Sequence, residues 1–213
     1  MKKTMIAMMM LGLCGSAMAN EEMLKIAANA GCITCHQIEP RTDGKLPIGP
    51  AWKDVDRNGC DTRNDILKRD LTNLVFRSGT QNCVVESGTL NDPYSGEVIE
   101  FTKGQVSSME VQIDHVVALA DAWQTGAFKL SEAQRSQLAN DPLNLLAVKG
   151  RLNSQKSDSD AASWLPPNKS YRCAYVARQI AVKYKYGLWV TSAERSAMAQ
   201  VLSTCPNQLT PAG

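Results

Sequence analysis

The cysteines restrict the possible folds of this chain more than any other residue type. There are seven in 213 residues, and the chain begins like a secretory signal peptide, with Lys2 and Lys3, an apolar run from Met5 to Leu13, and small residues up to Ala19. The apolar run is shorter than the roughly 20 residues of a membrane-spanning helix, and no later segment approaches that length, so we expect no transmembrane segment. We predict a secreted or periplasmic product, cleaved after Ala19, in which disulfides can form.

Four of the cysteines are dispersed along the chain, and we expect them to form disulfides. Four cysteines allow three pairings, and the sequence alone does not choose among them. Proximity favours Cys60–Cys83 and Cys173–Cys205. Each bridge would close a loop of a few tens of residues and add about 3–4 kcal/mol of stability.

Composition is that of an ordinary globular protein. The chain is 44% hydrophobic and 21% charged, and its formal net charge is +2. These values exclude fibrous, disordered and low-complexity chains, and the length predicts one domain, or one domain with an appendage. The net charge alone argues neither for nor against a nucleic-acid partner.

The chain divides into three parts, which we expect to be a signal peptide (1–19), a segment with a Cys-x-x-Cys-His motif (20–55) and a folded domain (56–213). Hydrophobic periodicity, capping residues and turn residues predict mostly helices with a few short strands in the third part. The expected elements are a helix over 62–71, a hairpin over 84–101, a strand within 111–117, and helices over 118–123, 131–139, 171–186 and from 191 to near 205. Together they predict an α+β fold.

Only one histidine lies in the third part. His115 follows Asp114 at the end of a β-branched run, and Asn144 stands downstream in Pro-Leu-Asn-Leu-Leu-Ala-Val. Asn153 and Lys156 follow in Gly-Arg-Leu-Asn-Ser-Gln-Lys. Singly, such residues are more often structural, since asparagines near turns usually serve backbone geometry. Their occurrence together favours an active site.

With these residues the chain resembles the HNH (ββα-metal) endonucleases, and most closely the secreted bacterial proteins of that family. The resemblance rests on Asp-His-Val-Val-Ala-Leu and Asp-Pro-Leu-Asn-Leu-Leu-Ala-Val, and it extends over about 56–206. It implies a ββα-metal (HNH, or His-Me finger) nuclease core with several added helices, stapled by disulfides. By the same resemblance, His115 would be the general base, Asn144 would brace the loop that orients it, and Lys156 would clamp a substrate phosphate.

The chemistry of phosphodiester hydrolysis suits these residue types. It needs a base that activates water and a cation that neutralises the leaving oxygen. Histidine titrates near neutral pH, and Asp114 with the amide oxygen of Asn153 would supply the oxygen ligands that Mg²⁺ prefers, with Mn²⁺ as the alternative metal. Lys156 has the plain alternative of a solvated surface lysine.

The segment from 149 to 185 is strongly basic. Eight Lys and Arg side chains face two Asp side chains there, a local charge of +6. Such a stretch favours a polyanion and contacts to phosphates rather than to bases, although an ordinary basic helix face is the alternative. We therefore expect a nucleic-acid partner, most readily DNA, bound with little sequence specificity. No protein partner can be inferred.

The Cys32-Ile-Thr-Cys35-His36 motif matches the attachment site of c-type haem. Its surroundings resemble the front half of a class I cytochrome c, but the distal methionine and closing helix of that family are absent. Three alternatives remain open: covalent haem with an open or foreign sixth ligand, a local disulfide or adventitious metal site, or a fusion remnant without a cofactor.

The sequence therefore predicts a secreted, metal-dependent HNH endonuclease that hydrolyses DNA, with RNA as an alternative substrate. The main alternative function is that of a c-type haem redox protein with an inactive nuclease-like domain. A nucleic-acid-binding module without catalytic activity is the third. Metal-dependent cleavage and a Soret absorption band would discriminate among the three.

Overall fold

The computed structural model describes residues 52–104 and 107–211. The signal peptide and the Cys32, Cys35 and His36 motif lie outside these residues, so their predicted roles remain predictions. None of the described helices is long and apolar enough to cross a membrane. The elements are α2 (Thr62–Asp70), β1 (Leu71–Phe76), β2 (Val85–Asn91), β3 (Val98–Thr102), α3 (Ser107–Glu110), β4 (Val111–His115), α4 (Leu119–Gln124), η1 (Ala127–Lys129), α5 (Glu132–Asn140), β5 (Leu145–Lys149), α6 (Gly150–Lys156), η2 (Lys169–Tyr171), α7 (Arg172–Lys185) and α8 (Ser192–Leu202).

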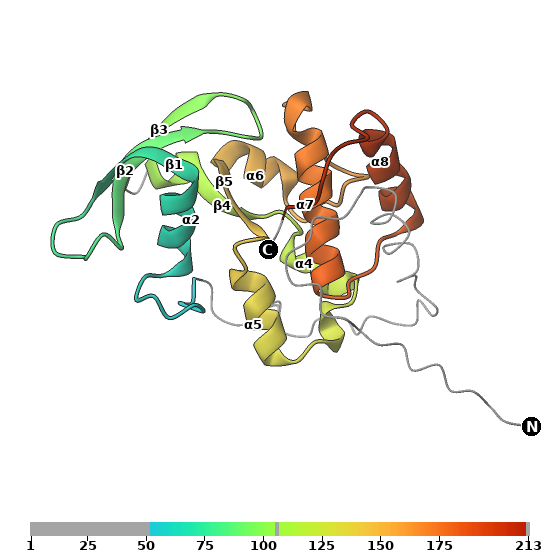
Figure 1. Ribbon diagram of the computed structural model, residues 1–213, viewed down its shortest axis with the longest axis horizontal. Helices are drawn as coiled ribbons and strands as arrows, with labels where there is room; N and C mark the ends of the chain where they lie inside the picture. The colour runs from blue at the N-terminus through green and yellow to red at the C-terminus, as the bar shows by residue number, and fades with distance from the viewer. Residues whose placement is uncertain (1–51, 105–106, 212–213) are drawn as a thin grey trace, which may run out of the picture.

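The predicted α+β class is confirmed. Two small antiparallel sheets form, one with the strand order β1-β2-β3 and one from β4 and β5. Figure 1 shows the three-stranded sheet and α2 on one side of the β4–β5 pair, with α7 and α8 on the other. Helix α6 begins where β5 ends. Two strands followed by a helix are consistent with an HNH-type nuclease fold.

Local signals in the sequence account for most of the elements. Ser131 begins α5 with a capping box in which its hydroxyl accepts from the backbone of Gln134 while the Gln134 side chain accepts from the backbone of Ser131. Thr191 caps α8 in the same way that Asp61 caps α2, each side chain accepting from a backbone N–H three residues on. The expected hairpin is confirmed as β2 and β3.

Six elements were not predicted: β1, β5, α3, α6, η1 and η2. The strand β1 follows α2 without an intervening loop, and α3 and α6 are single short helices of four and seven residues. Short helices bury few side chains and so leave little periodicity in the sequence. Strand β1 has exposed residues on both faces, but Leu71 joins the core and Leu74 and Phe76 pack against it. Pairing with β2 adds to this packing.

The β4–β5 pair is the centre of the molecule because both of its faces are covered. Odd-numbered residues of the two strands join the core with α2 and β1–β3, and even-numbered ones join the core with α6, α7 and α8. The first group is Val111, Ile113, Leu145 and Ala147, and the second includes Leu146 and Val148. A pair of strands buried on both faces holds its backbone rigidly, which suits a site built on it.

The free edge of β5 is closed by side chains. The backbone N–H of Ala147 donates to Asp70 Oδ2 at 2.8 Å, and that of Lys149 donates to Asp92 Oδ1 at 2.9 Å. Arg69 donates to the carbonyl of Leu145 at 2.7 Å. These contacts satisfy backbone groups that would otherwise offer an edge for pairing with another chain.

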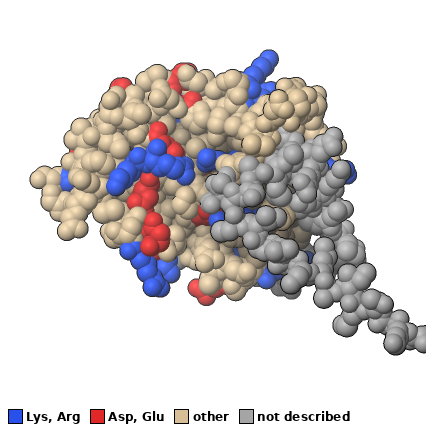
Figure 2. Space-filling view, in the orientation of Figure 1, with Lys and Arg blue, Asp and Glu red and all other residues tan. Residues whose placement is uncertain are grey.

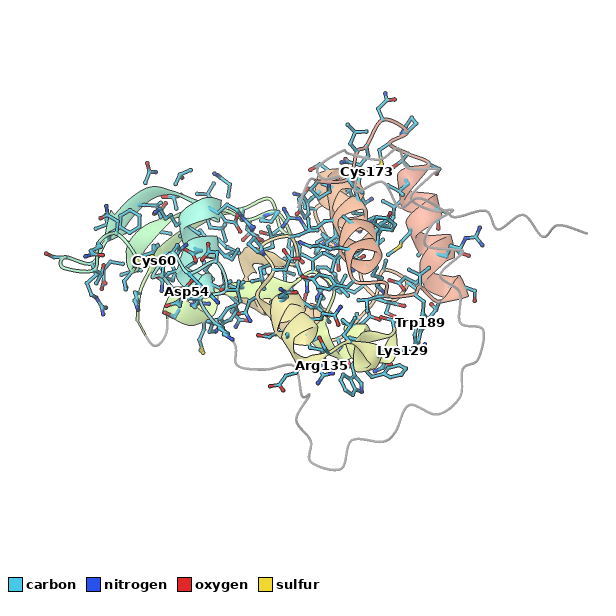
Figure 3. The ribbon with its side chains drawn as sticks, turned by 60° about the horizontal axis from the view of Figure 1, so that its bottom comes forward. Asp54, Cys60, Lys129, Arg135, Cys173 and Trp189 are labelled. Atoms are coloured by element: carbon cyan, nitrogen blue, oxygen red, sulfur yellow. A yellow bond between two sulfur atoms is a disulfide. The ribbon has the colours of Figure 1, made fainter. Side chains whose placement is uncertain are left out.

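Both favoured disulfide pairings are confirmed. Cys60–Cys83 joins the segment before α2 to the segment before β2, and Cys173–Cys205 joins the start of α7 to the segment after α8. Figure 3 places Cys60 at the α2 end of the molecule and Cys173 at the α7 end. The two bridges therefore staple opposite ends of the fold.

Candidate active site

The site is built on the last two residues of β4. Successive side chains of a strand point to opposite faces. Asp114 therefore lies on the face covered by α6 and α7, and His115 lies on the face covered by α2. In the register of the pair, Asp114 lies opposite Leu146 and His115 opposite Leu145. The two strands thus fix the backbone of both candidate residues.

His115 is held in a defined orientation. Its Nε2 lies 2.8 Å from the carbonyl oxygen of Ala139 in α5, and its half-buried ring is stacked near Trp52, with centroids 6.2 Å apart and planes at 15°. A carbonyl oxygen only accepts, so this contact assigns the proton to Nε2 and leaves Nδ1 as the acceptor of the neutral ring.

The electrostatic surroundings favour that neutral ring. Burial lowers the pKa of His115 from its ordinary value of 6.5, while the hydrogen bond to Ala139 and the charge of Asp114 act in the opposite direction. Because burial is the largest effect, the imidazole is unprotonated at neutral pH. This is the state that a general base requires.

Asn144 holds the chain that leaves His115. Its Oδ1 accepts from the backbone N–H of Val117 at 2.8 Å and its Nδ2 donates to the Val117 carbonyl at 3.2 Å. The carbonyl of Asn144 also accepts from the N–H of Val116 at 2.8 Å. The fully buried Asn144 side chain therefore serves a turn that has no regular secondary structure, directly after the candidate base.

Asp114 is the most enclosed member of the set. Its Oδ2 accepts from the hydroxyl of Tyr94 at 2.5 Å, and its Oδ1 lies 2.9 Å from the ammonium of Lys156. The residue is only 3% exposed. Burial and the nearby Asp114 charge raise the pKa of Tyr94 well above its ordinary value of 10, so its hydroxyl remains a donor to the carboxylate.

The placement of Lys156 differs from the expected phosphate clamp. The side chain is 0% exposed, and its ammonium also donates to the carbonyl of His115 at 2.8 Å. A lysine so enclosed and so engaged does not reach a substrate phosphate in this structure. It instead pairs with Asp114 and donates to the backbone of His115, so the predicted contact with a phosphate stays a prediction.

Asn153 lies on the same face as Asp114, one turn before Lys156 in α6. Its Nδ2 donates to Oε1 of Gln112 in β4 at 2.8 Å, which leaves Oδ1 as the amide atom suited to a metal ion. Across the face, Gln112 therefore pairs with Asn153 and Asp114 pairs with Lys156.

The donor set can be tested against a hard divalent ion. A carboxylate offers about four acceptor positions, of which Tyr94 and Lys156 use two, so Asp114 retains capacity for a cation. Carboxylate and amide oxygens are the ligands that Mg²⁺ takes while it keeps several waters. Within the described residues no three His, Cys, Asp or Glu side chains are grouped as metal ligands. The donor types are those that a hard divalent ion takes, while in this structure Asp114 is 3% exposed and its two oxygens are engaged by Tyr94 and Lys156.

Three contributors to the site were missed by sequence reasoning. Tyr94 lies in the turn between β2 and β3, Gln112 on β4 and Trp52 before α2. Tyr94 is 20 residues from its partner Asp114 and Gln112 is 41 residues from its partner Asn153, and Trp52 is also remote from His115, so only the fold brings each pair together. A polar residue two positions before Asp114 on the same strand was the one available signal, for Gln112.

The basic segment is less exposed than its composition suggests. Of its eight cations, Lys156 and Lys183 are buried in ion pairs, while Lys149 pairs with Glu97 and Lys185 with Asp141. On the face drawn in Figure 2, basic and acidic side chains lie next to one another. A continuous basic surface along this segment is therefore not present, and any contacts to phosphates must come from fewer residues.

Comparison with known proteins identifies the family. The family described as GmrSD restriction endonucleases, C-terminal domain, matches residues 61–201. An uncharacterized secreted protein of Arthroderma benhamiae is 39% identical over 158 residues, which is 73% of this chain and 72% of that protein. No solved structure matches the chain. The matched range contains His115, Asn144 and Asn153, and the chain belongs to the family of the GmrSD restriction endonuclease C-terminal domain.

Proposed function

We propose that this protein is a secreted HNH-type endonuclease that hydrolyses phosphodiester bonds of DNA, with RNA as the alternative substrate. The observation that carries the proposal is the state of His115, a neutral imidazole whose Nε2 is bound to Ala139 and whose Nδ1 is the acceptor. The family match supports a nuclease. The two disulfides and the secreted relative support export. Cleavage after Ala19 is part of the proposal.

In the proposed reaction, Nδ1 of His115 accepts a proton from a water molecule as the water attacks phosphorus. The bond from phosphorus to the 3′ oxygen then breaks, and the leaving oxygen takes a proton from solvent water, which gives a 5′-phosphate and a 3′-hydroxyl. Asn144 keeps the backbone after His115 in one conformation, and Lys156 holds the His115 carbonyl, so the ring approaches the water from a fixed direction. Preorganised geometry of this kind lowers the barrier because the entropy cost of orienting the base is met during folding rather than in the transition state.

A divalent ion, if bound, would be held by Asp114 and Asn153 and would stabilise negative charge on the leaving oxygen. The residues of the chain do the rest. Tyr94 and Lys156 orient the Asp114 carboxylate, and Gln112 orients the amide of Asn153. We assign Mg²⁺ as the metal on the chemistry of these oxygen donors.

Cleavage of supercoiled plasmid by the mature, oxidised protein tests this function. The assay is run with Mg²⁺, with Mn²⁺ and with EDTA, beside His115→Ala and Asn153→Ala, with circular dichroism to show that each variant is folded. General-base loss predicts a fall in cleavage of about 10²–10⁴-fold for His115→Ala. Nicking that survives in folded His115→Ala would contradict the assignment of the base. Binding of DNA without turnover under any metal would favour a module that only binds nucleic acid.

A further inference from the structure

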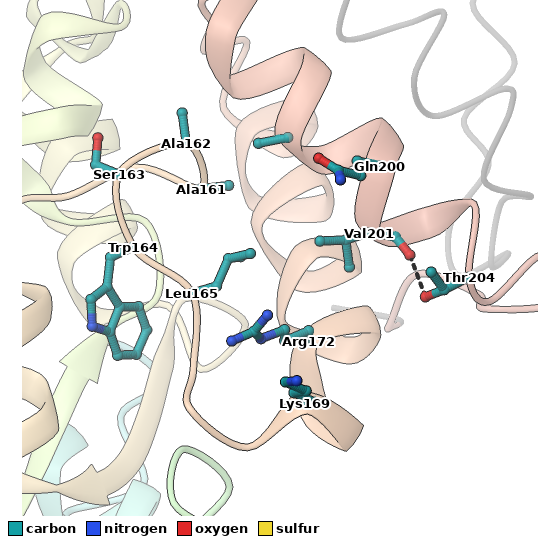
Figure 4. A pocket seen from close by; sticks show the side chains of 11 residues that line it. Ala161, Ala162, Ser163, Trp164, Leu165, Lys169, Arg172, Gln200, Val201 and Thr204 are labelled. Atoms are coloured by element: carbon teal, nitrogen blue, oxygen red, sulfur yellow. Dashed lines mark hydrogen bonds between the residues drawn. The ribbon is translucent and has the colours of Figure 1, made fainter.

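A groove outside the candidate active site lies between the loop at residues 161–165 and the helices α7 and α8 (Figure 4). Its volume is about 560 Å³, within the roughly 300–1,000 Å³ of sites that hold small organic ligands. The loop residues up to Leu165 form one wall, and Gln200 and Thr204 lie on the other; the indole of Trp164 is turned away from them, toward the core.

The positive charge of the groove favours an anionic ligand. Lys169 and Arg172 line it, and among the described lining residues there is no Asp or Glu. Lys169 is exposed, and the Nε of Arg172 donates to the carbonyl of Pro166 at 2.8 Å, which holds the guanidinium stem. Figure 4 shows the guanidinium of Arg172 extended toward Leu165, across the groove. Two cations against an apolar wall suit an anion that carries a flat apolar group.

The groove is built rather than incidental, because both of its sides are fixed. The ring of Trp164 packs against Tyr94 at 5.1 Å and against Tyr175 at 5.7 Å, between centroids. Arg172 precedes Cys173 and Thr204 precedes Cys205, so the second disulfide ties the two sides together beside the groove.

The same contacts connect the groove with the candidate site. Trp164 packs on Tyr94, and the hydroxyl of Tyr94 binds Asp114 at 2.5 Å. A single aromatic ring therefore separates the groove wall from the proposed metal-binding carboxylate. Two cations of the basic segment also lie here, Lys169 and Arg172, which like Arg151 and Arg178 have no carboxylate partner in the described ion pairs.

We propose that this groove binds one nucleotide unit of a nucleic-acid strand, with the phosphate between Lys169 and Arg172 and the base against Leu165. The proposal rests on the proposed nuclease function for the identity of the strand as substrate. Phosphate and apolar contacts do not read the edge of a base, so the groove would add affinity without sequence specificity.

Binding is tested separately from catalysis, in the His115→Ala background. Anisotropy of a fluorescent single-stranded octanucleotide is measured over a range of salt concentrations, with Lys169→Ala added. A lost phosphate contact predicts affinity about tenfold weaker at low salt and a slope of log affinity against log salt that is smaller by roughly 0.7–1. Lys103→Ala, an exposed lysine after β3, is the matched control and should change neither. An unchanged affinity and slope for Lys169→Ala would overturn the proposal.

Two further measurements separate the possible failures. A fluorescent octamer of glutamate replaces the oligonucleotide, and an equal loss of its binding in Lys169→Ala would show a general anion surface, which overturns the nucleotide assignment. With His115 intact, Lys169→Ala should lower kcat/KM for DNA but leave hydrolysis of bis(p-nitrophenyl) phosphate unchanged, since that small diester does not span both sites. Failure of the wild-type protein to cleave either substrate counts against the nuclease function, while the anisotropy result still decides the groove.

Discussion

The ammonium of Lys156 lies 2.9 Å from Oδ1 of Asp114, and both side chains are almost completely buried. The pair links α6 to the end of β4, and the second contact of Lys156, to the carbonyl of His115, extends the link to the candidate base. An ion pair of this kind is costly to break from one side, because the remaining charge stays buried without compensation.

Lys156→Met should therefore destabilise the protein strongly. The expected loss is about 3–5 kcal/mol in the free energy of unfolding, because the substitution leaves the buried carboxylate of Asp114 without a compensating charge. Urea unfolding monitored by circular dichroism measures it. Lys103→Met is the exposed control, expected within about 0.5 kcal/mol of wild type. A loss below about 1 kcal/mol for Lys156→Met would show that the pair is not closed in solution.

The second prediction concerns the pH dependence of cleavage. Because burial lowers the pKa of His115 below its ordinary 6.5, kcat/KM should already be at its plateau at pH 7 and should fall only in more acidic solution. Trp52→Ala removes the ring stacked beside His115 and exposes the imidazole. The acid limb should then move upward toward 6.5.

The pH profile of kcat/KM for the two proteins, measured at constant ionic strength, gives the answer. Trp123→Ala is a suitable control, because that tryptophan packs against Phe128 rather than His115. An acid limb that stays in place in Trp52→Ala would mean that Trp52 does not shield the base.

Sequence reasoning recovered what is local. The alternating β-branched run around Ile113, the capping box at Ser131 and the turn between β2 and β3 each carry their own signal, and all three elements formed as expected. The Asp114 and His115 pair was found because the two residues adjoin at a strand end. The sequence alone did not show that the two side chains lie on opposite faces, because that follows only once the residues are known to form a strand.

What sequence reasoning missed is long-range. Lys156 has the pattern of a solvated helical lysine, since the partner that buries it is 42 residues away. Tyr94 is 20 residues from Asp114, and its place in a turn gives no sign of that contact. Local periodicity carries no information about such pairs, because burial of a charge depends on the tertiary partner that compensates it.

Gly150 offers a test of packing at the start of α6. A Cβ built on this residue would lie 1.9 Å from the carbonyl oxygen of Met109 and 3.1 Å from Nε2 of Gln112. Gly150→Ala should therefore push α6 away from β4, with a loss of about 1–3 kcal/mol or more in the free energy of unfolding. Cleavage should fall as well, because Asn153 and Lys156 move with the helix.

Thermal and urea unfolding of Gly150→Ala check the size of this effect. Gln155→Ala is the matched control, an exposed position in the same helix where alanine has the higher helix propensity. It should be neutral or slightly stabilising. Equal stability of the two variants would show that the close approach of α6 to Met109 is relaxed in solution.

The last prediction concerns a buried group of charges far from His115. Lys183 lies 2.7 Å from Oε1 of Glu194 and 3.0 Å from Oδ2 of Asp121, so two carboxylates share one ammonium. Burial raises the pKa of Glu194 to about 7 and raises that of Asp121, while Lys183 acts in the opposite direction on both. The folded protein therefore binds a proton at Glu194 more tightly than the unfolded chain does.

For a group whose pKa is raised on folding, the stabilisation is fully present below the unfolded pKa, ordinarily 4.5 for Glu, and is lost as the pH rises through about 7. Glu194→Gln cannot titrate, so the free energy of unfolding of the variant should lose less between pH 5 and pH 8 than that of the wild type. The difference between the two curves should be on the order of 2–3 kcal/mol. Urea unfolding at unit steps of pH gives both curves, and the contribution of His115, whose lowered pKa acts with the opposite sign, cancels in the difference. Parallel curves would show that Glu194 stays ionised throughout, paired with Lys183.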